Sequence, residues 1–163
     1  MVGAVSLLAG TIAPGDPFAS TGPALRPPSA QHLMGTDNFG RDIFDAVVHG
    51  LRTSVTLALG VVAIALVIGL AVGIVSGYRG GLLDDVLMRF AEVFQAIPLF
   101  FLALLVVAFF GAGLDNLILL LGLTIWADDL VRVIRAGALS IRRREFVEAA
   151  RAMGASETRI MLR

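Results

Sequence analysis

Long uncharged runs dominate the pattern of hydrophobic and polar positions along this chain. No charged residue occurs from Thr53 to Tyr78 or from Val93 to Leu114. Because about 20 consecutive apolar residues cross the hydrocarbon core of a bilayer, each run is long enough for a spanning helix. A third run, 116–127, is too short to span unless its helix continues through the charged residues that follow. The pattern predicts an all-α, polytopic bundle with spanning helices at about 53–78, 88–111 and 114–137.

Small residues mark one face of the first predicted span. They are spaced four positions apart, at Ala65, Gly69, Gly73 and Gly77. Small side chains on one helix face allow a neighbouring membrane helix to come close. We therefore expect a helix-packing face at Gly69, Gly73 and Gly77, with a direct substrate contact as the alternative. In the second span, Pro98 predicts a kink, which fits either a gate hinge or an ordinary helix entry.

Charged residues follow the third uncharged run. Arg132 lies four residues after Asp128 and three after Asp129, so it is placed to pair with either carboxylate on one helix face. Charges inside a membrane usually face a bundle interior or an aqueous path. Asp128, Asp129 and Arg132 are therefore candidates for lining a transport pathway. The alternative is that they anchor the helix end among the lipid headgroups.

The segment before the first span, residues 1–52, has three parts. Its start, Val2 to Ala13, is apolar but short, and we interpret it as the end of a truncated first helix. Five prolines between positions 14 and 28 predict an extended segment outside the membrane. Apolar positions from Ile43 to Leu51 then follow a helical period, which predicts an interfacial amphipathic helix.

The last segment, 139–163, is polar enough to leave the bilayer. Phe146, Ala149, Ala150 and Met153 form one apolar strip at helical spacing, with Glu145 and Glu148 beside it. Gly154 predicts a helix stop, and Glu148 is placed to pair with Arg144 or Arg151. Two short helices with a bend between them would fit a groove in a partner protein. The alternative is an amphipathic helix lying on anionic membrane lipid.

Composition supports the membrane class and excludes several functions. The chain is 57% hydrophobic and 16% charged, against about 25% charged in soluble domains. Its formal net charge is zero, so no attraction to nucleic acid is expected. Cysteine is absent and there are two histidines, so we predict neither a metal site nor a cofactor. All 13 basic residues are arginine, so the lysine of a phosphate-binding loop is lacking. The chain is therefore not expected to be an enzyme, and any ATPase must be a separate subunit.

Arginine distribution predicts the orientation in the membrane. Residues 128–163 contain eight arginines, whereas the turn at 111–116 contains none. Cytoplasmic loops carry an excess of basic residues. We therefore expect 77–91 and 128–163 in the cytoplasm and 111–116 outside. By parity, the region before Thr53 also lies outside.

Several motifs resemble a known family. Glu148-Ala-Ala-x-x-x-Gly154 resembles the EAA signature of the permease subunits of ATP-binding cassette (ABC) importers. Gly35-Thr36-Asp37, Gly40-Arg41-Asp42 and Gly77-Tyr78-x-Gly80-Gly81-x-x-Asp84 resemble segments of the oligopeptide, dipeptide and nickel permease group. Asp45-Ala46 and Asp128-Asp129 depart from what is usual in that group. The resemblance covers about residues 30–163.

The resemblance implies a multi-pass permease subunit of a bacterial or archaeal plasma (inner) membrane. Its segment 139–163 would be an EAA-type coupling helix that docks on ABC ATPase subunits. Further implied partners are a second permease subunit, identical or different, and an extracytoplasmic substrate-binding protein. Peptides or metal chelates are the implied substrates. The docking residues would be Glu145, Phe146, Glu148, Ala149, Ala150, Met153 and Gly154.

Two other interpretations stay open from the sequence. One is a secondary transporter, driven by an ion gradient, that uses Asp128 and Asp129 as cation or proton sites. The other is a non-functional permease fragment. Family members have about six spanning helices, whereas this chain predicts three and part of a fourth.

Overall fold

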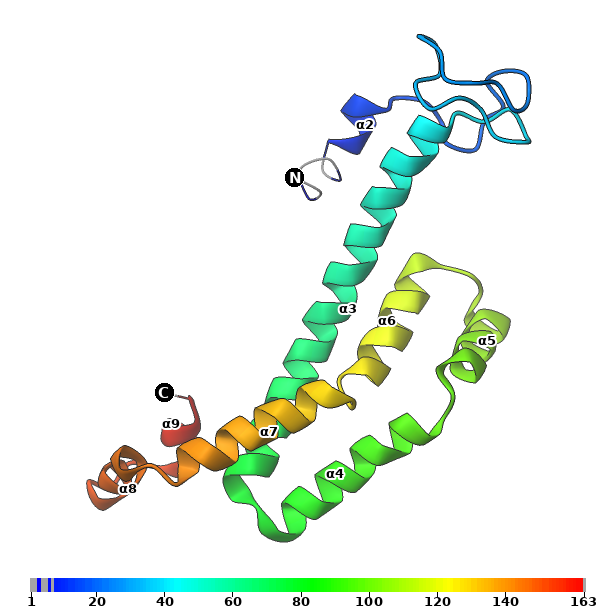
Figure 1. The fold of residues 1–163 in the computed structure, drawn as a ribbon. Helices are drawn as coiled ribbons and strands as arrows, with labels where there is room; N and C mark the ends of the chain where they lie inside the picture. The colour runs from blue at the N-terminus through cyan, green and yellow to red at the C-terminus, as the bar shows by residue number, and fades with distance from the viewer. Residues whose placement is uncertain (1–2, 4–5, 7, 163) are drawn as a thin grey trace. The chain divides into compact units, whose positions relative to one another are not determined.

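The computed structural model describes residues 3, 6 and 8–162, and the fold class is the predicted one, all-α. In these residues no strand occurs apart from two isolated β-bridges. The chain divides into two compact units, residues 1–59 and 60–163, and α3 contributes to both. The helices of Figure 1 are α2 (Ala9–Ile12), α3 (Ile43–Arg79), α4 (Gly81–Ala96), α5 (Leu99–Phe110), α6 (Leu114–Ile125), α7 (Asp129–Arg142), α8 (Glu145–Ala152) and α9 (Glu157–Leu162).

The first unit contains α2, a long loop and the start of α3. Ala9, Ala13 and Val48 are buried together, and Phe44 packs against them. Of the predicted end of a first helix at 2–13, the described residues Gly3 and Ser6 and those of the short α2 are helical. The rest of that prediction falls on Val2, Ala4, Val5 and Leu7, which lie outside the described residues together with Met1.

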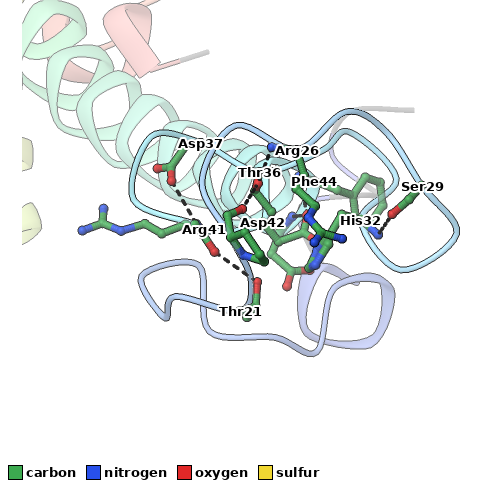
Figure 2. Close-up of polar contacts among 12 residues, drawn as sticks. Thr21, Arg26, Ser29, His32, Thr36, Asp37, Arg41, Asp42 and Phe44 are labelled. Atoms are coloured by element: carbon green, nitrogen blue, oxygen red, sulfur yellow. Dashed lines mark hydrogen bonds and ion pairs between the residues drawn. The ribbon is translucent and has the colours of Figure 1, made fainter.

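The loop between α2 and α3, residues 14–42 (the N-terminal loop), folds back on itself instead of being extended as its prolines predict. Isolated bridges pair Ser20 with Arg41 and Thr36 with Asp42. The Thr36 hydroxyl accepts from the Arg26 N–H (2.9 Å), as Figure 2 shows. It also donates to the Pro23 carbonyl (2.7 Å). Side-chain bonds to the backbone thus replace regular secondary structure in this loop.

Gly40 allows the close approach that the N-terminal loop requires. Its φ is +74°, a conformation that L side chains rarely adopt. A Cβ atom at this position would also overlap the Gly22 carbonyl oxygen. Two N–H groups of the opposing strand of the loop, those of Thr21 and Gly22, donate to the Gly40 carbonyl. Only glycine satisfies both the backbone conformation and the spacing here.

The helix α3 joins two elements that the sequence predicts as separate. The amphipathic helix at 43–51 and the first span form one helix of 37 residues, because nothing between them interrupts the backbone hydrogen bonds. Asp42 caps its start: Oδ1 accepts from the N–H groups of Phe44 (2.8 Å) and Asp45 (3.4 Å).

The second predicted span is broken at Pro98. The helices α4 and α5 meet there at a bend of 76°. Ile97 has an extended backbone (φ −90°, ψ 120°), as expected for a residue that precedes proline. Proline also lacks the N–H that would continue the helix. The predicted kink at Pro98 is therefore present, and it is large enough to separate two helices.

The third predicted span is also broken, between α6 and α7. The buried Trp126 donates from Nε1 to the Leu123 carbonyl (3.0 Å), and Phe90 and Phe94 flank its ring. The Gln95 side-chain amide donates to the Ala127 carbonyl. Because the break frees that carbonyl from the helix, a polar partner from α4 satisfies it. The continuous helix at 114–137 is therefore a wrong prediction.

Among the described residues, α3 is the one helix long and apolar enough to cross a membrane by itself. The bent pair α4–α5 adds a second span if the pair is counted as one. The core of the second unit lies where α3, α4 and α7 meet. Its buried members are Ala65, Ala91, Trp126, Ala127 and Val131.

Candidate partner-docking site in the C-terminal helices

The helices α8 and α9 form a bent pair, residues 145–162, that we call the C-terminal knob. A turn at Arg143 and Arg144 separates it from α7. Gly154 ends α8 with φ +83° and donates its N–H to the Arg151 carbonyl (2.9 Å). The next N–H, of Ala155, donates to the Ala150 carbonyl (3.1 Å). These two bonds form a Schellman motif, the usual way in which a glycine ends a helix.

The predicted apolar strip of α8 is largely exposed to solvent. Phe146 is 59% exposed and Met153 is 83% exposed. Ala149 is exposed and Ala150 is half-buried. Glu145 and Glu148 are exposed as well. The knob therefore presents apolar and acidic side chains together on one accessible surface.

Val147 anchors the knob, and the sequence pattern missed this role. Its side chain is 1% exposed, although its neighbour Phe146 is largely exposed. An apolar groove of about 420 Å³ lies beside it, lined by Leu70, Ile74, Tyr78, Ile134, Gly137, Ala138, Ile141, Phe146, Val147 and Ile160. The spacing of Val147 and Ala150 was the available signal, since residues three apart share a helix face. The side of α8 that carries Val147 therefore faces α3 and α7 across this groove, and the side that carries Glu145, Glu148 and Met153 is open.

Arg151 ties the knob to the end of α3. Its Nη2 donates to the Tyr78 hydroxyl (3.1 Å), and its Nε donates to Glu157 Oε1 (3.1 Å). The guanidinium carbon lies 5.5 Å from the centre of the Tyr78 ring, within the range of a cation–π contact. Hydrogen bonds from Tyr78, which has the larger effect, and from Arg151 hold the pKa of Glu157 below its ordinary value. The predicted pairing of Glu148 with Arg144 or Arg151 is wrong: within the described residues Arg151 pairs with Glu157 instead.

The small-residue face of α3 lies against α7. A Cβ atom built at Gly69 would lie 3.0 Å from Leu130 Cδ2, and one at Gly77 would lie 2.5 Å from the Arg135 carbonyl oxygen. At Gly73 the nearest atom is Ile134 Cγ2, at 2.8 Å. At Gly69 and Gly73 the nearest atom belongs to a side chain of α7, whereas at Gly77 it belongs to the α7 backbone. Of these three positions, the two helices therefore approach most closely at Gly77.

Asp128, Asp129 and Arg132 do not form the ion pair that their spacing predicts. In the described part of the chain Arg132 Nη2 donates to Gln95 Oε1 (3.0 Å) instead. Both carboxylates are exposed. Asp128 lies beside a cleft of about 300 Å³ at the two helix breaks, where Gln95, Pro98 and Thr124 also contribute to the lining. The backbone turn at Asp128, which starts α7, directs these residues differently from a continuous helix.

Comparisons with known proteins agree on one family. A family model described as "Binding-protein-dependent transport system inner membrane component" matches residues 69–163. The dipeptide transport system permease protein DppC of Alkalihalophilus pseudofirmus is 36% identical over 146 residues, which cover 88% of this chain and 48% of that protein. The nickel transport system permease protein NikC of Escherichia coli is 37% identical over 150 residues, 91% of this chain and 54% of that protein. The oligopeptide transport system permease protein OppC of Bacillus subtilis is 33% identical over 138 residues, 85% of this chain and 45% of that protein. The chain spans about half the length of these curated relatives.

Proposed function

The chain belongs to the family of binding-protein-dependent transport system inner membrane components, and from this premise we propose that it forms part of the permease subunit of an ATP-driven importer. The relatives are named for the transport of dipeptides, oligopeptides and nickel. Peptides or metal chelates are accordingly the proposed substrates. The proposed partners are ABC ATPase subunits, a second permease subunit and an extracytoplasmic binding protein.

The C-terminal knob is the proposed docking site for the ATPase. The observation that carries this proposal is the contrast within α8 between exposed Phe146 and buried Val147. An amphipathic helix normally buries its apolar face, so an exposed Phe and Met on a helix that is already anchored indicate a surface for a partner. A helix whose apolar residues recur at three- and four-residue spacing fits a groove in another protein.

The knob is well placed to pass motion into the spanning helices. It follows α7 directly, and Arg151 links it to Tyr78 at the end of α3. In the proposed mechanism, ATP binding closes the two ATPase subunits and moves the docked knob. The helices α7 and α3 then switch the pathway between its inward-open and outward-open forms. This chain makes and breaks no covalent bond in the cycle.

Asp128 is a proposed pathway residue. Irregular backbone at membrane depth is tolerated where it is buried in protein or lines a cavity, and the cleft beside Asp128 lies at two such breaks. Asp129 and Arg132 follow within the first turn of α7. These three residues are proposed to contact substrate or water rather than to hold the fold, because none of them is buried.

The docking role is tested in the full-length permease expressed with its ATPase subunit. Truncating Phe146 and Met153 to alanine should weaken retention of the ATPase subunit by about tenfold or more, the effect of losing central anchors of an interface. Membrane insertion should be unchanged, because both side chains are exposed. The readout is the amount of ATPase subunit that copurifies, together with substrate uptake.

Phe100→Ala is the matched control. Phe100 is also highly exposed, but it lies on α5, away from the knob in the sequence. It should leave ATPase retention at the wild-type level. Wild-type retention in the Phe146/Met153 double variant would contradict docking through this surface.

A further inference from the structure

A buried carboxylate joins three helices of the second unit near the base of the knob. Asp84 of α4 accepts from Ser76 of α3 through Oδ1 (2.5 Å). Arg135 of α7 donates to the same carboxylate twice, from Nε to Oδ1 (2.6 Å) and from Nη2 to Oδ2 (2.5 Å). Asp84 and Ser76 are both buried. We call Ser76, Asp84 and Arg135 the charge clamp.

The role of the charge clamp is indicated by its geometry, and not by its contribution to the free energy of unfolding. Asp84 is buried and the Arg135 side chain is 35% exposed. Such an ion pair adds little net stability, because removing the carboxylate from water costs about as much as its attraction to the guanidinium returns. An apolar or neutral pair would hold three helices together as well. A bidentate arginine–carboxylate pair, in contrast, fixes the distance and the orientation of its partners. The clamp therefore sets a geometry that apolar packing alone does not specify.

The clamp lies on the route from the knob to the spanning helices. Along α7, Arg135 is followed by Arg142, which donates to the Arg79 carbonyl at the end of α3 (3.2 Å). Gly77 and Arg135 mark the closest approach of α3 and α7. The other polar side-chain links from α4 to α7 and to the turn before it are made by Gln95, near the opposite end of α4, to Arg132 and the Ala127 carbonyl. At the start of α4, the clamp supplies the polar link to α3 and α7.

We propose that the charge clamp makes α3, α4 and α7 move as one body when the knob moves. Asp84 and Arg135 are positioning residues: they contact neither substrate nor nucleotide, and they transmit displacement from α7 to α4. This inference rests on the proposed function, since it requires a knob that an ATPase subunit moves. It assigns the coupling step to two side chains outside the EAA-like motif.

The test distinguishes a role of Asp84 and Arg135 in holding the fold together from a role in transmitting motion. In the full-length permease complex, Arg135→Gln leaves the Asp84 carboxylate buried without its counter-charge, so it should lower the amount of assembled complex. Asp84→Asn leaves Arg135 unpaired, but the Arg135 side chain is 35% exposed and keeps contact with water, so its loss of complex should be smaller. The double variant D84N/R135Q removes both charges and keeps two similar shapes. It should assemble and hydrolyse ATP at wild-type levels. Its ratio of substrate taken up to ATP hydrolysed should fall about tenfold or more, the factor that one charge-assisted hydrogen bond is worth.

Asp85→Asn is the matched control. It removes the same charge one position away, at an exposed residue of α4 that makes no side-chain hydrogen bond in the described residues and acts on Arg135 only through its charge. Its coupling ratio should equal that of the wild type. Arg135→Lys keeps the charge but loses the bidentate fork, so its ratio should lie between those of the wild type and D84N/R135Q.

Each outcome decides between the proposals. A wild-type coupling ratio in D84N/R135Q would overturn the clamp and leave ATPase docking intact. A double variant that fails to assemble would make the pair a requirement of folding and would also overturn the transmission role. Wild-type permease that retains no ATPase subunit would refute the proposed function itself.

Discussion

Asp42 is the residue on which the N-terminal loop and the start of α3 both depend. Its Oδ1 caps the helix, and its Oδ2 lies 2.7 Å from His32 Nδ1 in the loop. Burial of Asp42 raises its pKa, but the hydrogen bonds from His32, Phe44 and Asp45 outweigh burial and leave the pKa below its ordinary value. The contacts that join the loop to the helix through this carboxylate therefore favour its ionised form.

Asp42→Asn should destabilise the protein at pH 7 by about 1–3 kcal/mol, the contribution of hydrogen bonds to a charged group. Because the pKa of Asp42 is lowered in the folded state, its stabilisation is full above the ordinary value of 3.8. That stabilisation is lost as the pH falls through the lowered folded-state pKa. Thermal unfolding in detergent at pH 7 and pH 3 should show the gap between wild type and variant narrowing at the lower pH.

Asp45→Asn serves as the control for this measurement. Asp45 lies three residues further along and accepts no hydrogen bond through its side chain in the described part of the chain. It should unfold like the wild type at both pH values. A gap for Asp42→Asn that widens as the pH falls would contradict a lowered pKa.

The sequence predicts which residues of α8 form an apolar strip and where the helix ends, but it does not predict the directions in which the side chains point. The apolar strip of α8 follows from its spacing, and so does the stop at Gly154. The opposite burial of Phe146 and Val147 does not, because it depends on where Tyr78 and Ile141 lie in the folded chain. The ion pairs predicted from sequence spacing are wrong for the same reason. Arg132 had two candidate carboxylates within one helix turn, yet it contacts Gln95, 37 residues away.

At the scale of elements, glycine spacing along α3 predicts the surface that α7 covers. The contact at Gly77 is to the backbone of α7, so it has no flexible side chain that could give way. Close backbone approach through small residues is a common basis of helix association in membranes. The packing of α3 on α7 should therefore tolerate no added carbon at this position.

Gly77→Ala should destabilise the packed helices by about 1–3 kcal/mol, the usual cost of forcing an extra methyl group into a filled interface. Gly50→Ala in the same helix is the matched control, because a Cβ atom there meets nothing within 4 Å. Alanine also favours the helix by about 0.5–1 kcal/mol over glycine. Denaturation of the two variants in mixed micelles should thus shift in opposite directions. Equal shifts would show that α7 does not press on Gly77.

Of the two helix breaks, one was predicted from the sequence and the other was not. The break at Pro98 follows from the chemistry of proline and was expected as a kink. The break before Asp128 was not expected, since Trp126 and Ala127 continue an apolar run. It becomes stable because the Gln95 amide, 32 residues away, satisfies the carbonyl of Ala127. A partner so distant in the sequence leaves no local pattern.

At the scale of the whole molecule, the arginine distribution and the proposed docking role predict the same side of the membrane for the C-terminal knob. The knob has to be cytoplasmic to meet an ATPase, and the arginine-rich segment 128–163 predicts that side independently. The N-terminal loop and the turn at Gly111 should then face outward, where a binding protein would deliver substrate. Sidedness therefore tests the family-based mechanism without any measurement of transport.

The chain contains no cysteine, so single introduced cysteines report the side of each segment directly. Gln31→Cys, Ala112→Cys and Ser156→Cys are suitable because all three positions are exposed. A membrane-impermeant maleimide applied to intact cells should label Gln31→Cys and Ala112→Cys. Ser156→Cys should react only after the cells are permeabilised, which also serves as its control for reactivity. Labelling of Ser156→Cys in intact cells would place the knob outside, where no ATPase could drive it, and the proposed importer mechanism would fail at its first step.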